Sequence, residues 1–179
     1  VTHFIEFPFR EKSTRWDLDN HVVNNAMALK LGAILYRLSG DADDRLLAKT
    51  AIEQLDRWHG QASGVISGDE SLAGLMPSQG TELCAVVEYL HSLEVLAATL
   101  GDPWIGDRLE KIGFNALPAT FSPDMWSHQY DQQANQVVCE ISDDRVYTTN
   151  NADSNIFGLE PNFGCCTANM HQGWPKFAS

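Results

Sequence analysis

Apolar side chains recur at three- and four-residue steps along much of the chain, which is the pattern of helices with one buried face. The first such segment ends at Gly40 and has Asp17 or Asp19 as its candidate N-cap. A second helix is predicted over residues 41–59, closed by Gly60. Because the turn between the two is short, they are expected to form a helical hairpin.

Two further helices follow a loop rich in glycine and serine, which covers residues 60–80. A long loop in a compact domain is usually functional or disordered. The third helix is predicted from about Leu83 to Leu100, and the fourth from about Pro103 to Leu117. Proline suits the first turn of a helix, and Pro118 is expected to end the fourth one.

After Pro118 the helical period is lost, and the chain becomes rich in Asn, Asp and Gln. Short β-prone pieces lie at Val137–Ile141 and Arg145–Thr148, and a helix is predicted to start again at Gly164. The predicted fold is therefore mainly α, with helical hairpins and an irregular, partly β excursion before two adjacent cysteines. Helical hairpins build both solenoids and closed barrels.

Composition and charge narrow the choice of partners. A chain of 179 residues, of which 44% are hydrophobic, can bury one sizeable core, so a single domain over residues 1–179 is expected. Twelve basic residues against 24 acidic ones give a net charge of −12, which repels nucleic acid and anionic membranes. No run approaches the roughly 18 apolar residues of a membrane helix, and "VTHFIEFPFREK" lacks the features of a signal peptide. The compartment stays open.

The chain has four cysteines, and two of them, Cys165 and Cys166, are adjacent. Four cysteines at this spacing do not suggest a disulfide scaffold. The pair could be a vicinal disulfide, two unrelated buried thiols, part of a metal site, or a nucleophile with a partner. The predicted helix start favours the last two, because a helix N-terminus stabilises a thiolate.

Glu82 and Cys84 lie at the predicted entrance of the third helix. Residues two apart point in opposite directions inside a helix, but they can converge if Glu82 is not yet helical. Together with Cys165 and Cys166 they would provide four ligands, three thiolates and a carboxylate, for a metal such as zinc. Spacing alone does not establish this site, since it is not the pattern of a zinc finger.

Three other residues are candidates for chemistry or sugar binding. Glu70, in the Gly-flanked stretch "SGDESLAG", is either a solvated loop acid or a catalytic one. His21 shares a predicted helical turn with Asn24 and Asn25 and either lines a pocket or is an ordinary hydrogen-bonded histidine. Tyr130 lies in "HQYDQQANQ", where polar groups among aromatic rings could hold a sugar or simply form a loop.

Five stretches, in order, resemble the β-L-arabinofuranosidase-type glycoside hydrolases, glycoside hydrolase family 127 and its relatives. They are "SGDESLAG", "GTELC", "FNALPA", the tyrosine of "HQYDQQANQ", and "NFGCCTAN". The likeness runs from about Trp16 to Phe177. It implies an (α/α)6 barrel with added β-sandwich domains, of which this chain would be the second half of the barrel, without the sandwiches.

The resemblance also implies a role for each candidate residue. The zinc ligands would be Glu82, Cys84, Cys165 and Cys166. Cys165 would also be the nucleophile and Glu70 the general acid/base, while His21 and Tyr130 would contact the sugar or orient the reacting groups. The implied function is a retaining glycoside hydrolase that releases arabinofuranose or a similar sugar.

Two other functions remain open at this point. One is a non-catalytic helical module in which the metal site is structural. The other is a metal-free helical binding or scaffold domain whose cysteines are merely buried. For all three, pairing of two copies through exposed barrel edges is conceivable.

Overall fold

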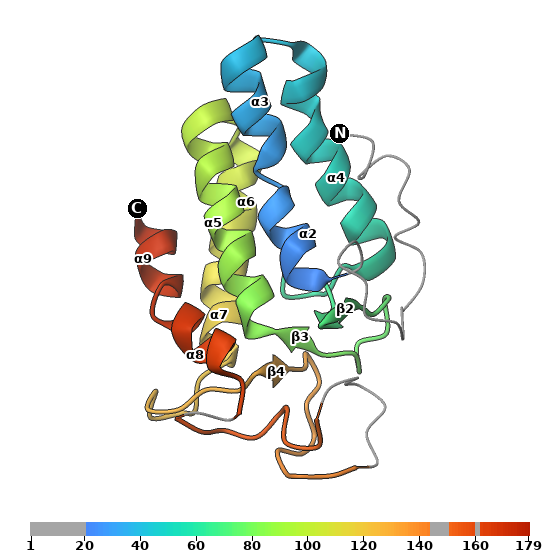
Figure 1. Cartoon of the computed structure of the whole chain (residues 1–179), viewed down its shortest axis with the longest axis vertical. Helices are drawn as coiled ribbons and strands as arrows, with labels where there is room; N and C mark the ends of the chain where they lie inside the picture. The colour runs from blue at the N-terminus through green and yellow to red at the C-terminus, as the bar shows by residue number, and fades with distance from the viewer. Residues whose placement is uncertain (1–20, 144–150, 160–161) are drawn as a thin grey trace.

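The computed structural model describes residues 21–143, 151–159 and 162–179, and within them the protein is mainly helical, as predicted (Figure 1). The helices are α2 (Val22–Ala28), α3 (Leu31–Ser39), α4 (Ala42–His59), α5 (Leu83–Leu100), α6 (Pro103–Lys111), α7 (Leu117–Ala119), α8 (Gly164–Met170) and α9 (Gly173–Ala178), with a π-helical turn, η1 (Ile112–Ala116), between α6 and α7.

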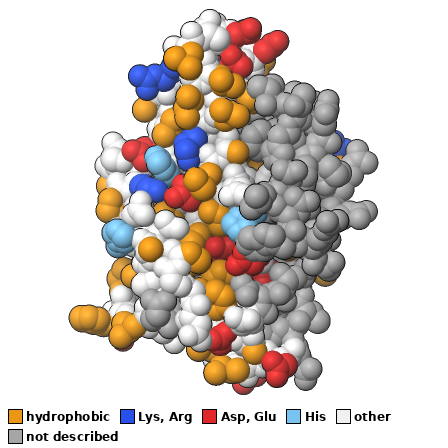
Figure 2. All heavy atoms as spheres, in the orientation of Figure 1, with side chains coloured by type: hydrophobic (Ala, Val, Ile, Leu, Met, Phe, Trp, Pro, Cys, Tyr) orange, Lys and Arg blue, Asp and Glu red, His pale blue; other side chains and the backbone are white. Residues whose placement is uncertain are grey.

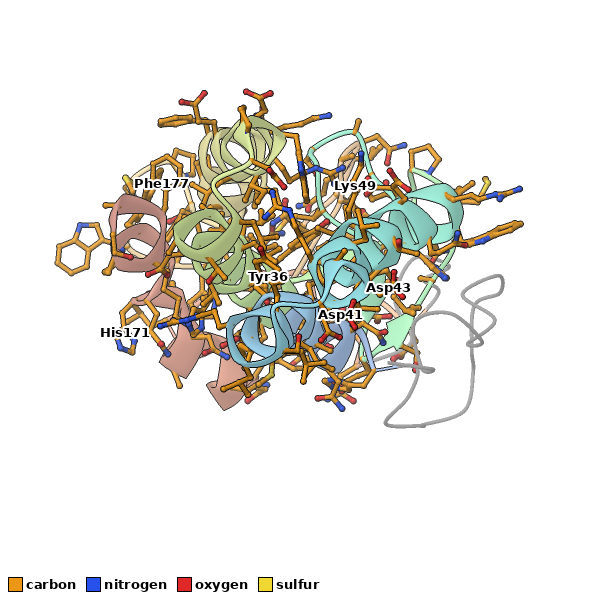
Figure 3. The ribbon with its side chains drawn as sticks, turned by 90° about the horizontal axis from the view of Figure 1, so that it is seen from above. Tyr36, Asp41, Asp43, Lys49, His171 and Phe177 are labelled. Atoms are coloured by element: carbon orange, nitrogen blue, oxygen red, sulfur yellow. The ribbon has the colours of Figure 1, made fainter. Side chains whose placement is uncertain are left out.

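Helix α5 forms the centre of the core. It contacts α2, α3, α6, α8 and α9, and the view from above shows it among the other helices (Figure 3). By length and composition alone α5 could cross a membrane, but most of it is buried inside the protein. That burial explains its apolar sequence as the sequence of a core helix.

The first predicted helix is two helices in the structure. It begins at Val22, and the ring of His21 caps it by accepting a hydrogen bond from the Asn24 N–H. Asp17 and Asp19, the predicted caps, lie outside the described residues. A contact from another helix explains the break between α2 and α3. The Ser92 hydroxyl of α5 donates a hydrogen bond to the Ala26 carbonyl at 2.6 Å. A side chain inserted into the hydrogen-bond ladder interrupts a helix.

The hairpin of α3 and α4 forms as predicted. Gly40 ends α3 in a left-handed conformation with φ 69°, and Asp41 caps α4 by accepting from the Asp43 N–H. Figure 3 shows Asp41 and Asp43 together at this turn. The two helices approach closely at Gly32, where an added Cβ would lie 2.9 Å from the Asp44 carbonyl oxygen.

The fourth predicted helix differs from the prediction at its end. α6 gives way to the π-helical turn, and Pro118 lies inside α7 instead of ending the helix before it. Proline has no N–H to donate within the helix, and the wider π turn accommodates that missing bond. Gly113 in this turn receives the ring of Phe177, since a Cβ there would lie 2.5 Å from that ring.

A small sheet covers the end of the bundle at which α5 begins (Figure 1). Its strands are β1 (Gly68–Asp69), β2 (Ser71–Leu72), β3 (Thr81–Glu82) and β4 (Asp131–Gln132), in the order β2-β1-β3-β4. β1 is antiparallel to β2 and parallel to β3, and β3 is antiparallel to β4. The loop predicted over residues 60–80 therefore supplies two of the four strands, β1 and β2.

The excursion after Pro118 is irregular and partly β, but not where it was predicted. The prediction of a strand at Val137–Ile141 is wrong: this segment is not a strand, and Val137 is 90% exposed. β-branched side chains favour strands when they can pack against neighbours, and these side chains do not. The piece at Arg145–Thr148 lies outside the described residues.

A charged cluster fastens α9 to the core. Glu88 of α5 pairs with Lys176 of α9 at 3.3 Å and with Lys30, between α2 and α3, at 3.7 Å. Its side chain is only 12% exposed. On the face of the molecule that Figure 2 shows, Lys, His and acidic side chains gather in one group. One carboxylate thus compensates two half-buried ammonium groups from separate elements.

Replacing Glu88 with Gln should therefore destabilise the fold, because it keeps the shape and removes the negative charge. We expect the free energy of unfolding to fall by about 2 kcal/mol, less than for a fully buried pair. Urea unfolding followed by circular dichroism measures it. Glu53→Gln is the matched control on the exposed face of α4, where the loss of the Lys49 pair should cost under about 0.5 kcal/mol. Equal losses for the two variants would contradict the role of Glu88.

Candidate metal centre

The junction of β3 and α5 brings Glu82 and Cys84 to the same side, as predicted. Glu82 is the last residue of β3 and has an extended backbone, with φ −65° and ψ 134°. Cys84 lies in the first turn of α5. The strand pairing with β4, in which Glu82 lies opposite Asp131, fixes the direction in which the chain enters the helix.

The start of α8 supplies the two other ligands. Cys166 is buried and its Sγ lies 3.3 Å from the Cys84 Sγ, whereas Cys165 is exposed. One ligand atom from each of Glu82, Cys84, Cys165 and Cys166 lies within 4.8 Å of the others. All four cysteines of the chain are free thiols, so the adjacent pair is not a vicinal disulfide. The arrangement can hold a metal ion.

The electrostatics of this group favour a bound cation. Burial raises the pKa of the Glu82 carboxyl to about 8, and the nearby Glu70 carboxylate and Cys165 thiol act in the same direction. Hydrogen bonding with Cys165 raises the pKa of the Cys84 and Cys166 thiols, and the same bonds lower the pKa of Cys165. Without a cation the three sulfurs must therefore share protons. A metal ion would replace these protons and compensate the charge.

Glu70 lies beside this group, at the tip of the β1–β2 hairpin. Its backbone is left-handed, with φ 76°, which is uncommon for a residue other than glycine. Its carbonyl accepts from the Val22 N–H at 2.8 Å, and its own N–H donates to a Glu82 carboxylate oxygen at 3.3 Å. The hairpin tip is thereby tied both to α2 and to a metal-ligand residue.

The two other predicted site residues hold the carboxylate of Glu70. The Tyr130 hydroxyl donates to Oε1 at 2.9 Å, and the buried Tyr130 ring stacks on Phe163 with the centroids 3.9 Å apart. His21 Nε2 lies 3.3 Å from Oε2. Since His21 Nδ1 accepts from the Asn24 N–H, Nε2 carries the proton and donates to Glu70.

This tautomer argues against a second metal site. Ligand atoms of His21, Glu70 and Glu82 also lie within 4.8 Å of one another. A metal ion needs a lone pair on the histidine nitrogen that faces it. His21 directs an N–H to Glu70 instead, so we describe these three residues as a hydrogen-bonded group next to the metal centre.

Three contacts at the site were not predicted from the sequence. Asn169 Nδ2 donates to the Cys84 Sγ at 3.1 Å, and the His128 Nε2 lies 3.1 Å from the Thr167 hydroxyl on α8. The third is the stacking of Phe163 on Tyr130. Helical spacing could have indicated Asn169, because it lies four residues after Cys165 and so on the same face. Nothing in the pattern pairs His128 with Thr167.

Comparison with known proteins adds no assignment: no protein-family model, no curated protein and no solved structure matches the chain. The functional argument therefore depends on the geometry of the site together with the resemblance of the five sequence stretches.

Exposure within the site predicts a pattern of thiol labelling. Iodoacetamide should modify Cys165 before the buried Cys84 and Cys166 in metal-free protein. Adding Zn²⁺ should slow the labelling of Cys165, because a coordinated sulfur is less nucleophilic. Peptide mass spectrometry at timed intervals measures each site. Cys139, exposed and outside the cluster, is the internal control; equal slowing of Cys139 and Cys165 by Zn²⁺ would contradict a metal centre here.

Proposed function

We propose that the chain is part of a zinc-dependent retaining glycoside hydrolase of the β-L-arabinofuranosidase type, and that its hairpins belong to an (α/α)6 barrel. One observation carries the proposal: Glu70 adjoins a group of one carboxylate and three sulfurs, of which Cys165 is exposed. A candidate proton donor, Glu70, and a candidate nucleophile, Cys165, thus both lie close to Glu82. These residues are far apart in the sequence and meet only in the fold. Their proximity supports the resemblance to the β-L-arabinofuranosidase-type glycoside hydrolases.

The donor set suits zinc. Soft thiolates with one carboxylate, four ligands in all, match the tetrahedral coordination of Zn²⁺. Hard cations such as Mg²⁺ and Ca²⁺ prefer oxygen ligands. The bound zinc would keep the Cys165 sulfur deprotonated at neutral pH and moderate it so that it can leave again.

In the proposed reaction Cys165 and Glu70 act on the same glycosidic bond. The Cys165 sulfur attacks the anomeric carbon, and a C–S bond forms as the bond to the leaving oxygen breaks; Glu70 gives its proton to that oxygen. The Glu70 carboxylate then takes a proton from water, whose oxygen bonds to the anomeric carbon as the C–S bond breaks. Two displacements at one carbon retain its configuration.

His21 and Tyr130 would serve this reaction by positioning. Their hydrogen bonds to the two oxygens of Glu70 hold the carboxyl group in one orientation. Tyr130 is fully buried, which suits a supporting role better than a wide contact with the sugar. The substrate we infer is a small neutral carbohydrate, which the net charge of −12 does not repel.

A structural metal site is the second candidate, and the burial of three ligand residues favours it. Glu82 and Cys84 are each 2% exposed and Cys166 is fully buried. A closed site of this kind staples elements together. The hydrolase requires Cys165 to act as a nucleophile and Glu70 to act as an acid/base. A structural metal site requires neither activity.

Replacing Cys165 with Ser should lower the kcat for an aryl β-L-arabinofuranoside by more than about 10³-fold, because the nucleophile is lost. Zinc content, measured by elemental analysis, separates loss of metal from loss of chemistry. In the unsubstituted protein, rapid quenching and peptide mass spectrometry should find a glycosyl adduct on Cys165. Cys139→Ser is the matched control and should keep full activity. Full turnover by Cys165→Ser would refute the nucleophile.

Replacing Glu70 with Gln should affect substrates according to their leaving groups. We expect a loss of about 10²–10⁴-fold for alkyl glycosides, which need a proton on the departing oxygen, and a smaller loss in the first step for activated aryl glycosides. Pre-steady-state release of the aryl group isolates that step. A loss of equal size for both substrate classes would argue against an acid role.

A further inference from the structure

We propose that Asn169 is a positioning residue of the metal centre: its side-chain amide donates a hydrogen bond to the Cys84 sulfur and holds this sulfur as a metal-ligating thiolate. The inference rests on the proposed function only in so far as the cluster binds a metal. It assigns a role to a residue that does not itself coordinate the ion. It also distinguishes Cys84, as a permanent ligand, from Cys165, as the reactive one.

Asn169 lies on α8, the helix whose first turn contains the two adjacent cysteines. Asn169 lies three residues after the buried Cys166, so these two residues share one face of the helix. That face packs on α5, and Asn169 Nδ2 lies 3.1 Å from the Cys84 Sγ. One short helix therefore supplies two ligands and the hydrogen-bond donor to a third ligand.

A second contact determines which end of the amide faces the sulfur. The Gln172 side-chain amide donates to Asn169 Oδ1 at 3.2 Å. With Oδ1 accepting from Gln172, the NH₂ group of Asn169 is the end directed at Cys84, so the two contacts agree on the orientation of the amide. The backbone supports the pair, since the Gln172 N–H also donates to the Asn169 carbonyl at 3.0 Å.

The chemical consequence follows from the burial of Cys84, which is 2% exposed. In such surroundings an N–H···S bond stabilises the negative charge of a thiolate more than it would in water. It also fixes the direction of the sulfur lone pairs that remain for the metal. Hydrogen bonds to metal ligands typically change metal affinity by 10–100-fold.

Zinc affinity in competition with a chelating dye tests the inference directly. Asn169→Leu is close in size and removes the donor, and we expect it to bind Zn²⁺ about 10–100-fold more weakly than the unsubstituted protein. The same variant loaded with Co²⁺ should show a shifted thiolate-to-metal charge-transfer band. Asn115→Leu is the matched control, since Asn115 is an exposed helical asparagine bonded only locally to the Lys111 carbonyl, and its affinity should not change.

A measurement on the unsubstituted protein covers the case in which Asn169→Leu does not fold. In protein loaded with ¹¹³Cd²⁺, NMR should show coupling between cadmium and an Asn169 side-chain amide proton, transmitted through the N–H···S bond. Cadmium bound without this coupling, or equal zinc affinity of the variant and the unsubstituted protein, would overturn the inference alone. Failure of the unsubstituted protein to bind Zn²⁺ or Cd²⁺ would overturn both the inference and the proposed function.

Discussion

Three thiols and a carboxyl group lie within 4.8 Å of one another, and because only Cys165 among them is exposed, they cannot all ionise unless a cation joins them. This constraint organises the described part of the chain. Burial raises the pKa of the Glu82 carboxyl to about 8, and hydrogen bonding with Cys165 raises the pKa of the Cys166 thiol. A purely structural core would gain more from apolar side chains of the same volume. The composition of the cluster is thus compatible with a bound metal ion, which these four residues could hold.

The packing of the helical core fixes the starts of two helices, α5 and α8, against each other. The entrance of α5 carries Glu82 and Cys84, and α8 must lie on α5 for Cys165 and Cys166 to meet them. Glu88 contributes from the same helix one turn beyond Cys84, because its pair with Lys176 holds α9, which follows α8 directly. Packing, ion pairing and ligand geometry thus depend on the same helix.

Much of the fold could be predicted from local pattern, and the rest depends on contacts distant in sequence. Periodicity predicted α4 and α5, and the helix entrance predicted that Glu82 and Cys84 converge. The break after α2 could not be predicted, because it arises from the hydroxyl of Ser92, 66 residues away. The strands β1–β4 are two residues long, too short for any alternation, and form through pairing alone. Asn169 was not predicted either, although helical spacing could have indicated it, four residues after Cys165.

The backbone of Glu70 is the observation that most favours the proposed catalytic role over a purely structural one. A left-handed residue at a hairpin tip is normally glycine or asparagine, and a glutamate there costs on the order of 1 kcal/mol. Burial of apolar surface does not offset this cost, because the group that the side chain carries into its 26% exposed position is a carboxylate. What the glutamate provides is a carboxylate held by Tyr130 and His21 next to Glu82. Backbone strain of this kind is typical of functional positions, and it therefore supports the proposed role of Glu70 as an acid/base.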